Sequence, residues 1–262
     1  MSRSAILKRL ISPLVLPALL SVGLSGCFTL RQGVFAPPTT AEVGPVLDNY
    51  GEAVIPANGL IVVQGDDLIY GVAEHSRRPG INGSSVHRTG VTITETMRQA
   101  LKPVTIVNQG YPGDTAAAGA ERWAGTPAGN LTILSYGYGD AVAKTPVAEF
   151  DLALRTMVRR AHAQGAAVFL IPPPPMAAAP VVPGQKPKAG PHLLSTAEIE
   201  PYRADMRVVG LSESAEVFEP QAEIVRVKAT PTRTITQSPE IYQAIAAGLV
   251  PYIRIVSPPR RR

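Results

Sequence analysis

The sequence has few of the residues that cross-link small secreted folds or attract nucleic acid. Cys27 is the only cysteine among 262 residues, so an internal disulfide is excluded. The formal net charge is only +5, and Arg3, Lys8 and Arg9 lie in an acid-free N-terminal segment that we expect to be removed. Without them the basic surplus is about two, and it lies partly in the tail 257–262, which we expect to be solvated. Nucleic-acid binding is therefore not expected.

Long uninterrupted apolar runs are also missing from the N-terminal region. The apolar segment 10–24 is interrupted by Pro13 and Pro17 and follows a positively charged start, which indicates an export signal rather than a membrane span. It ends in Leu24-Ser25-Gly26-Cys27, which resembles the lipobox of bacterial lipoproteins. The resemblance implies a signal peptide over 1–26 and a lipid anchor, such as palmitate, on Cys27. A plain secretory signal with an incidental cysteine is the alternative.

The residues after Cys27 predict location and a tether. Phe28 stands where an aspartate would indicate retention in the inner membrane, so the resemblance implies the outer membrane of the cell envelope, facing the periplasm. Proline pairs and polar residues follow with no sustained hydrophobic period, which predicts a tether over 27–57. The expected membrane contact is therefore through the N-terminal anchor alone.

The remaining residues have the composition of a folded α/β domain, with 45% hydrophobic and 17% charged residues overall. Short β-branched runs alternate with amphipathic segments, which predicts a three-layer α/β/α domain over 58–256 around a doubly wound, mostly parallel sheet. A proline-rich insertion at about 172–192 is expected to be extended and exposed, and 71–90 to be a loop. Strands are expected at 60–64, 104–108, 130–136, 166–171 and 217–218, and helices at 92–101, 116–123, 150–163, 198–209 and 240–253.

Four segments in chain order resemble the sequence blocks of the SGNH/GDSL hydrolase superfamily of esterases, lipases, thioesterases and carbohydrate deacetylases. Gly65-Asp66-Asp67 resembles the first block, Gly-Asp-Ser, and residues 108–115 resemble the second. Residues 137–140 resemble the third block, Gly-x-Asn-Asp, and 238–246 resemble the segment after the family's Asp-x-x-His. The match spans about 59–254, and it implies the flavodoxin-like SGNH-hydrolase fold.

The residues that would carry acyl transfer are missing from these blocks. Such a site needs a hydroxyl nucleophile, an imidazole base, an acid that orients the base, and donors for the oxyanion. Gly113 matches the oxyanion-hole glycine, whereas the positions of the serine, asparagine, aspartate and histidine hold Asp67, Gly139, Arg233 and Thr236. All four histidines precede Arg233. We therefore expect no catalytic residue at these positions.

This combination predicts a lipid-anchored SGNH-like pseudoenzyme that binds an envelope glycan or protein partner without hydrolysis. One alternative is an active ester hydrolase or O-acyltransferase of the GDSL type, with a rearranged site that takes His75, His87 or His192 from loops. A further alternative is a structural envelope lipoprotein with no ligand. None of these hypotheses needs a cofactor.

The candidate ligand cleft consists of polar residues beside the blocks. Asp67, Tyr70, Tyr111, Tyr138 and Asp140 are its expected members, because tyrosines near a cleft can stack on sugar rings. Packing in the core or at the rim is the alternative for the tyrosines, and a structural cap or turn is the alternative for Asp140.

Two adjacent acids in the first block raise the question of a metal. Asp66 and Asp67 have no histidine or third carboxylate nearby in sequence, so the sequence does not predict a metal site. If Arg233 lies in the region of the family's base, it could pair with Asp67. Such a pair would neutralise a partly buried acid, and we keep it as a hypothesis.

Overall fold

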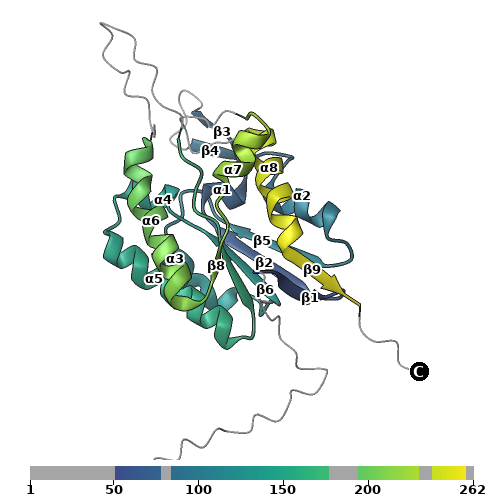
Figure 1. Ribbon diagram of the computed structural model, residues 1–262. Helices are drawn as coiled ribbons and strands as arrows, with labels where there is room; N and C mark the ends of the chain where they lie inside the picture. Colours follow the sequence, from purple (N-terminus) through teal and green to yellow (C-terminus); the bar gives the residue numbers. More distant parts are fainter. Residues whose placement is uncertain (1–50, 78–83, 177–193, 230–237, 258–262) are drawn as a thin grey trace, which may run out of the picture. The chain divides into compact units, whose positions relative to one another are not determined.

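The computed structural model describes residues 51–77, 84–176, 194–229 and 238–257 (Figure 1). For residues 73–77 and 84–86 the structure describes the backbone alone. Several expectations therefore lie outside the described residues: the signal peptide, lipid attachment at Cys27, the Asp67–Arg233 pair, Thr236, and the side chains of His75 and His192.

A five-stranded parallel sheet forms the centre of the domain (Figure 1). Its order, β5-β2-β6-β7-β8, places β2 between two strands that follow it in the chain, as in a doubly wound sheet. All side chains of β6 and β7 are buried, as expected for parallel strands covered on both faces. The strands are β2 (Leu60–Gly65), β5 (Thr105–Gly110), β6 (Leu131–Ser135), β7 (Ala167–Leu170) and β8 (Glu216–Val217).

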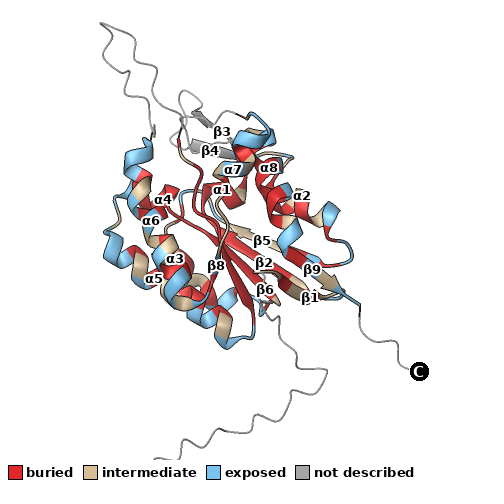
Figure 2. Cartoon of the chain, viewed as in Figure 1, coloured by how far each residue is buried: buried red, intermediate tan, exposed pale blue. Residues whose placement is uncertain are grey.

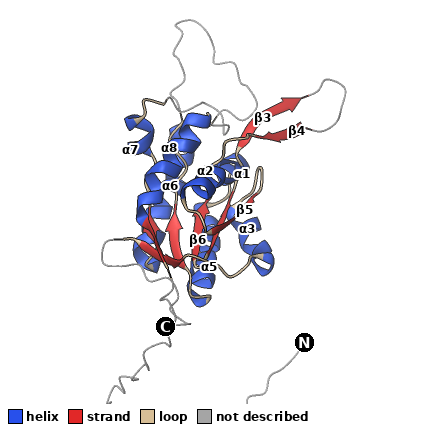
Figure 3. Cartoon of the chain, turned by 90° about the vertical axis from the view of Figure 1, so that its right-hand side faces the viewer, coloured by secondary structure: helices blue, strands red, loops and turns tan. Residues whose placement is uncertain are grey.

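Helices cover both faces of this sheet (Figures 1 and 3). Helices α3, α5 and α6 pack together on one face, and α2, α7 and α8 lie on the other. Buried residues concentrate in the strands and on the inward sides of the helices (Figure 2). The predicted three-layer α/β/α fold is thus confirmed. The helices are α1 (Asp67–Tyr70), α2 (Ile93–Ala100), α3 (Ala116–Glu121), α4 (Tyr138–Ala143), α5 (Val147–Ala163), α6 (Thr196–Glu213), α7 (Gln221–Arg226) and α8 (Pro239–Leu249), with 3-10 turns η1 (Arg122–Gly125) and η2 (Val250–Tyr252).

A second, two-stranded parallel sheet joins the two ends of the described domain. Strand β1 (Ala53–Pro56) pairs with β9 (Ile253–Val256) over their whole length. The last residues of the expected tether therefore belong to the folded domain, and the helix expected over 240–253 ends at Leu249. Pro251 explains that end, because a proline there would clash with the helix carbonyl four residues earlier. The partners of β1 lie far along the chain, so local sequence did not reveal the strand.

Strands β3 (Val72–Arg77) and β4 (Ser84–Arg88) form an antiparallel hairpin where a loop was expected. The hairpin projects from the body of the domain (Figure 3). Its sequence holds many polar residues and lacks the alternation of apolar and polar residues that predicts a strand. None of the helices in the described residues is both long and apolar enough to cross a membrane.

The start of the proline-rich insertion is buried rather than exposed, so that expectation is wrong for these residues. Prolines 172–174 are all buried. The carbonyl of Pro173 accepts a hydrogen bond from the Arg203 guanidinium, and that of Pro174 accepts one from the Tyr138 hydroxyl at 2.8 Å. Proline has no N–H to satisfy, so two side-chain donors make this burial possible. Residues 177–193 lie outside the described part of the chain.

Candidate functional site

The first three sequence blocks meet at the carboxyl ends of the central strands. Gly65, at the end of β2, is in register with Gly110 of β5 and Ser135 of β6, so the three following loops begin at one level. This is the switch point of the doubly wound sheet, where such folds place ligands. A Cβ at Gly65 would lie 2.2 Å from the Ser135 carbonyl oxygen, and one at Gly110 would lie 2.3 Å from the Tyr70 nitrogen. Glycine is needed at both strand ends because the chain passes so closely.

Asp66 ties the first block to the third. Its side chain is fully buried, and one oxygen accepts the N–H of Leu68 at 3.2 Å, which caps α1. The other oxygen accepts the N–H groups of Tyr138 at 2.8 Å and Gly139 at 3.2 Å. Burial, followed by the charge of Asp67, raises the pKa of Asp66 well above its usual value, although these hydrogen bonds oppose the shift. Asp66 is a structural carboxylate that positions both loops.

Asp67 occupies the position that matches the family's serine, and it contacts the second block. Its side chain is buried, and its Oδ2 accepts the N–H of Gly113 at 2.8 Å. Gly113 has φ +69°, a left-handed conformation that favours glycine. The amide that matches the family's oxyanion donor is therefore bound to a carboxylate of the same chain. A second anion at this amide would have to displace Asp67 and would meet its negative charge.

Gly139, at the position of the family's asparagine, has no room for a side chain. A Cβ built there would lie 1.8 Å from the Asp114 carbonyl oxygen. Its N–H donates to Asp66, as described above. The loop of the second block thus lies where an amide side chain would begin, and the site has lost both this donor and the space for it.

Asp140 is buried at the start of a helix, which is the position of a structural cap, so its assignment to an open cleft is wrong. It is buried, and both its oxygens accept the N–H of Ala116, at 3.1 and 3.3 Å, at the start of α3. Burial raises its pKa to about 6, against the lowering effect of hydrogen bonds from Ala116 and Thr145. The N–H group at the helix start favours the charged form, but burial opposes it more strongly.

The three expected cleft tyrosines differ in exposure. Tyr138 is fully buried, with its hydroxyl donating to a backbone carbonyl, so its assignment to the cleft is wrong. Tyr70 is half-buried, and the Arg88 guanidinium lies 5.5 Å from its ring centre. Tyr111 is 49% exposed, and the Arg122 guanidinium lies 4.2 Å from its ring centre. Only Tyr70 and Tyr111 remain available to a ligand.

Sequence reasoning missed two arginines at this site. Arg88 donates to the Tyr70 carbonyl at 2.9 Å, and Arg122 pairs with the buried carboxylate of Asp114. This pairing, with its accompanying hydrogen bonds, raises the pKa of Arg122. Asp114 lies in the second block and is the one signal that could have indicated a nearby cation. Each arginine thus lies over a tyrosine ring and is fixed by a second contact, and we call Tyr70, Tyr111, Arg88 and Arg122 the rim of the site.

His87 and His162 are the histidines whose side chains the structure describes, and His162 contacts backbone carbonyls outside the first block. The ring nitrogens of His162 lie 3.1 Å from the Ala166 carbonyl oxygen and 3.0 Å from that of Glu213, so this residue joins α5 to the end of α6. His87 is exposed on β4. Among the described residues no group of three histidines, cysteines or acids is arranged to hold a metal ion.

The fold and the loops at its switch point define the class of this protein. The model of the GDSL-like lipase/acylhydrolase family matches residues 64–236, more than half of the chain, and the chain belongs to that family. The match includes the first three blocks and the positions of Arg233 and Thr236. The comparison with curated proteins gave no match.

Solved structures with the same fold include three named as esterases. The M. smegmatis aryl esterase is 16% identical, with a TM-score of 0.57 over 74% of this chain and 97% of that one. Est24, a carbohydrate acetylesterase from Sinorhizobium meliloti, is 15% identical, with a TM-score of 0.56 over 74% and 97%. Axe2, an acetylxylan esterase from Geobacillus stearothermophilus, is 15% identical, with a TM-score of 0.52 over 76% and 95%. At these identities the likeness is one of fold.

Proposed function

We propose that this chain is a noncatalytic member of its family, which binds a ligand over the remodelled site without hydrolysing it. The observation that carries the proposal is the 2.8 Å hydrogen bond from the Gly113 N–H to Asp67. A carboxylate stands at the nucleophile position and occupies the oxyanion donor. Losing one such donor costs an ester hydrolase about 100- to 1,000-fold in rate. Losing nucleophile and base together removes essentially all of the acceleration that the triad supplies.

The rim supports a glycan or a protein as the ligand. Tyr111 and Tyr70 present partly exposed rings, and Arg122 and Arg88 lie against them. Aromatic faces stack on sugar rings, and guanidinium groups donate to hydroxyl and carboxylate oxygens. With the lipobox-like segment ending at Cys27, we place the protein on the periplasmic side of the outer membrane, where the ligand would be an envelope glycan or an envelope protein.

An ester hydrolase or O-acyltransferase is the second candidate, and family membership favours it. The three structural relatives above are named as an aryl esterase, a carbohydrate acetylesterase and an acetylxylan esterase. Activity here would need a new nucleophile and a base from His75, His87 or His192. Ester hydrolysis is therefore the reaction against which the noncatalytic proposal is tested.

The first experiment measures turnover of p-nitrophenyl acetate by the purified chain, with heat-denatured protein as the background. We expect no turnover above that background, and no labelling by a serine-directed phosphonate. Asp67→Ser is expected to remain inactive, because the base is still missing and Gly139 has no side-chain amide to stabilise an oxyanion. Turnover that a His→Ala change at 75, 87 or 192 abolishes would establish the hydrolase instead.

The second experiment measures binding to an array of envelope glycans and to envelope proteins in a pull-down. Tyr111→Ala is expected to weaken binding about fivefold, since loss of a stacking ring costs on the order of 1 kcal/mol. Leu211→Ala is the matched control, because Leu211 is 88% exposed on α6 and belongs neither to this rim nor to the lining of the cavity described below. Equal loss in both variants would show that the ligand does not bind at this rim, and absence of any ligand would favour a purely structural lipoprotein.

The anchor has its own test. Cys27→Ala is expected to move the protein from the membrane fraction to the soluble fraction and to abolish labelling by radioactive palmitate. Phe28→Asp should keep the lipid and move the protein to the inner membrane. A Cys27→Ala variant that keeps both palmitate and membrane association would contradict the lipoprotein proposal.

A further inference from the structure

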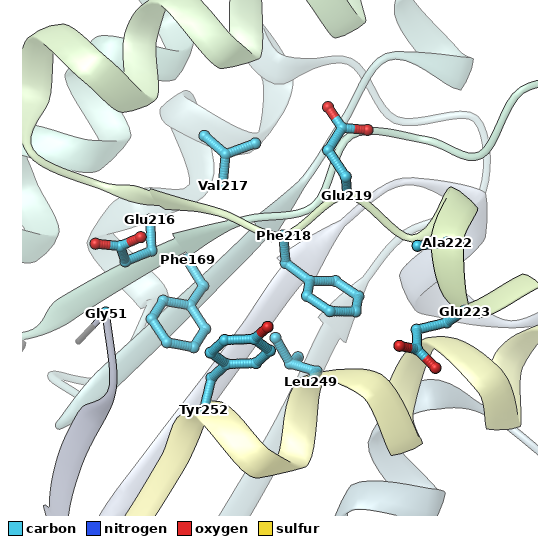
Figure 4. A pocket seen from close by; sticks show the side chains of 10 residues that line it. All are labelled: Gly51, Phe169, Glu216, Val217, Phe218, Glu219, Ala222, Glu223, Leu249 and Tyr252. Carbon is cyan, nitrogen blue, oxygen red and sulfur yellow. The ribbon is translucent and has the colours of Figure 1, made fainter. Parts of the chain in front are cut away.

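A cavity of about 280 Å³ lies at the β8 edge of the sheet and shares no lining residue with the remodelled site. It is bounded by β7 and β8, by α7, by the end of α8 with η2, and by Gly51 just before β1. The volume is near the lower limit for small-molecule pockets, so it suits one compact chemical group. Gly51, Phe169, Glu216, Val217, Phe218, Glu219, Ala222, Glu223, Leu249 and Tyr252 line it (Figure 4).

Aromatic rings form the centre of this cavity. Figure 4 shows the Tyr252 ring between Phe169 on one side and Leu249 and Phe218 on the other. Phe218 and Tyr252 meet edge to face, with ring centres 6.1 Å apart. Phe169 is 2% exposed and belongs to the core, whereas Tyr252 is 46% exposed and accessible to a ligand. Ring faces carry partial negative charge and attract cations.

Every charged residue of the lining is an acid. The charge of Glu219 is compensated by two ion pairs, because Arg203 and Arg207 of α6 lie 3.2 and 2.5 Å from its two oxygens. Glu223 pairs with Arg226 at 2.7 Å, but the Arg226 side chain is 62% exposed, and such a surface pair is weak. Glu223 therefore keeps part of its charge toward the cavity.

Glu216 is the acid with the most charge to offer. It is exposed, and within the described part of the chain no cation pairs with it. Its carboxylate lies against Gly51, where a Cβ would come within 3.3 Å of it. Gly51 has φ +73°, so a side chain is disfavoured there and the carboxylate keeps its place. Figure 4 shows Glu216 and Glu223 on opposite sides of the rings.

We propose that this cavity binds an organic cation, an ammonium or guanidinium group that stacks on Tyr252 and Phe218 between Glu216 and Glu223. Aromatic faces with nearby carboxylates recognise such groups, because the rings desolvate the cation while the acids supply charge. A bare metal ion fits less well, since it would need several oxygen ligands at short range. The inference is independent of what the remodelled site binds.

The test is a saturation-transfer NMR titration of the full chain with choline and with its neutral isostere, 3,3-dimethyl-1-butanol. We expect choline to bind at least about tenfold more tightly, because the two differ mainly in charge. Tyr252→Ala should weaken choline binding about tenfold and Tyr252→Phe should restore it, since the ring face is what binds. Equal affinity for both compounds, or no effect of Tyr252→Ala, would overturn the proposal.

Glu216→Gln tests the charge directly. It is expected to weaken choline binding about threefold to fivefold, and added salt should reduce the difference between variant and wild type. Glu121→Gln is the matched control, because Glu121 is also exposed but lies outside the cavity. Propylamine, propylguanidine and a capped lysine peptide then distinguish a free cation from a side chain of a protein. Binding of any of these supports the proposal, and binding of no cation contradicts it.

Discussion

The molecule holds carboxylates in two contrasting regions, the switch point of the sheet and the cavity beside β8. At the switch point Asp66, Asp67 and Asp140 are buried, and backbone N–H groups of neighbouring loops donate to each of them. In the cavity Glu216 and Glu223 lie beside aromatic rings and have little compensation from the chain. At the switch point, N–H groups of the chain bind the carboxylates, whereas at the cavity the carboxylates of Glu216 and Glu223 can interact with a ligand.

The two regions differ in how the chain treats its carboxylates. At the switch point, N–H groups of the loops are satisfied by carboxylates of the same chain. The cost is a buried charge, visible in the raised pKa values of Asp66 and Asp140. The two regions can therefore be separated by whether removing an acid destabilises the fold.

The largest effect is expected from Asp66→Ala. The change leaves the N–H groups of Leu68, Tyr138 and Gly139 without their acceptor in the protein interior. We expect a loss of about 4 kcal/mol in the free energy of unfolding, measured by urea denaturation. Asp66→Asn should cost less, because one oxygen can still accept from Tyr138. A loss below about 1 kcal/mol for the alanine variant would show that these bonds do not hold the loops together.

The next effect concerns the closed asparagine position. Gly139→Ala should destabilise the fold by about 3 kcal/mol, because its Cβ would overlap the Asp114 carbonyl oxygen. Gly125→Ala is the control, since a Cβ there meets no atom within 4 Å. Unfolding midpoints in urea compare the two. If Gly139→Ala is as stable as the control, the second-block loop can move and the space for an amide side chain is not lost.

A pH-dependent effect is expected at Asp140. Its pKa in the folded protein is about 6, against 3.8 ordinarily, so folding favours the protonated form. This contribution is complete below about pH 4 and is lost as the pH rises past 6. Asp140→Asn removes it, so the variant should gain up to about 3 kcal/mol on the wild type between pH 4 and 7. Thermal unfolding across that range measures the gain, and parallel curves for the two proteins would refute the assignment.

The smallest effect is expected at the cavity. Glu216→Gln should leave the unfolding midpoint unchanged, because the residue is exposed and forms no ion pair with another described residue. The same variant should still weaken binding of choline. A marked loss of stability in Glu216→Gln would mean that this acid, like Asp66, is structural, and the contrast between the regions would fail.

Much of the fold could be predicted because local sequence patterns indicate most of its strands and helices. Apolar β-branched runs marked the five strands of the main sheet, and the amphipathic segment 150–163 marked α5 to within three residues. Local patterns did not predict a strand whose pairing partner is far along the chain. They also did not predict the burial of a segment whose composition suggests exposure. Strand β1 pairs with a segment about two hundred residues later, and prolines 172–174 are buried by two side-chain donors.

The candidate site shows the same division between what local sequence predicts and what distant contacts decide. The sequence identified Asp67, Gly113 and Gly139 as family positions, because their blocks are short and contiguous. It misjudged Tyr138 and Asp140, because a block shows which residues are near the site but not which way they point. Tyr138 turns inward to the carbonyl of Pro174, and Asp140 turns to the N–H of Ala116.

By itself, the sequence determined the five strands of the main sheet, the family, and the absence of serine, asparagine and histidine from their expected blocks. Only the tertiary structure decided what replaces them, because those contacts join residues far apart in the chain. The Asp67–Gly113 hydrogen bond spans 46 positions, and the Asp66–Tyr138 bond spans 72. The cavity beside β8 likewise gathers residues from both ends of the described chain. Local propensity acts within a few residues, whereas packing sets the distances on which charge and hydrogen bonding depend.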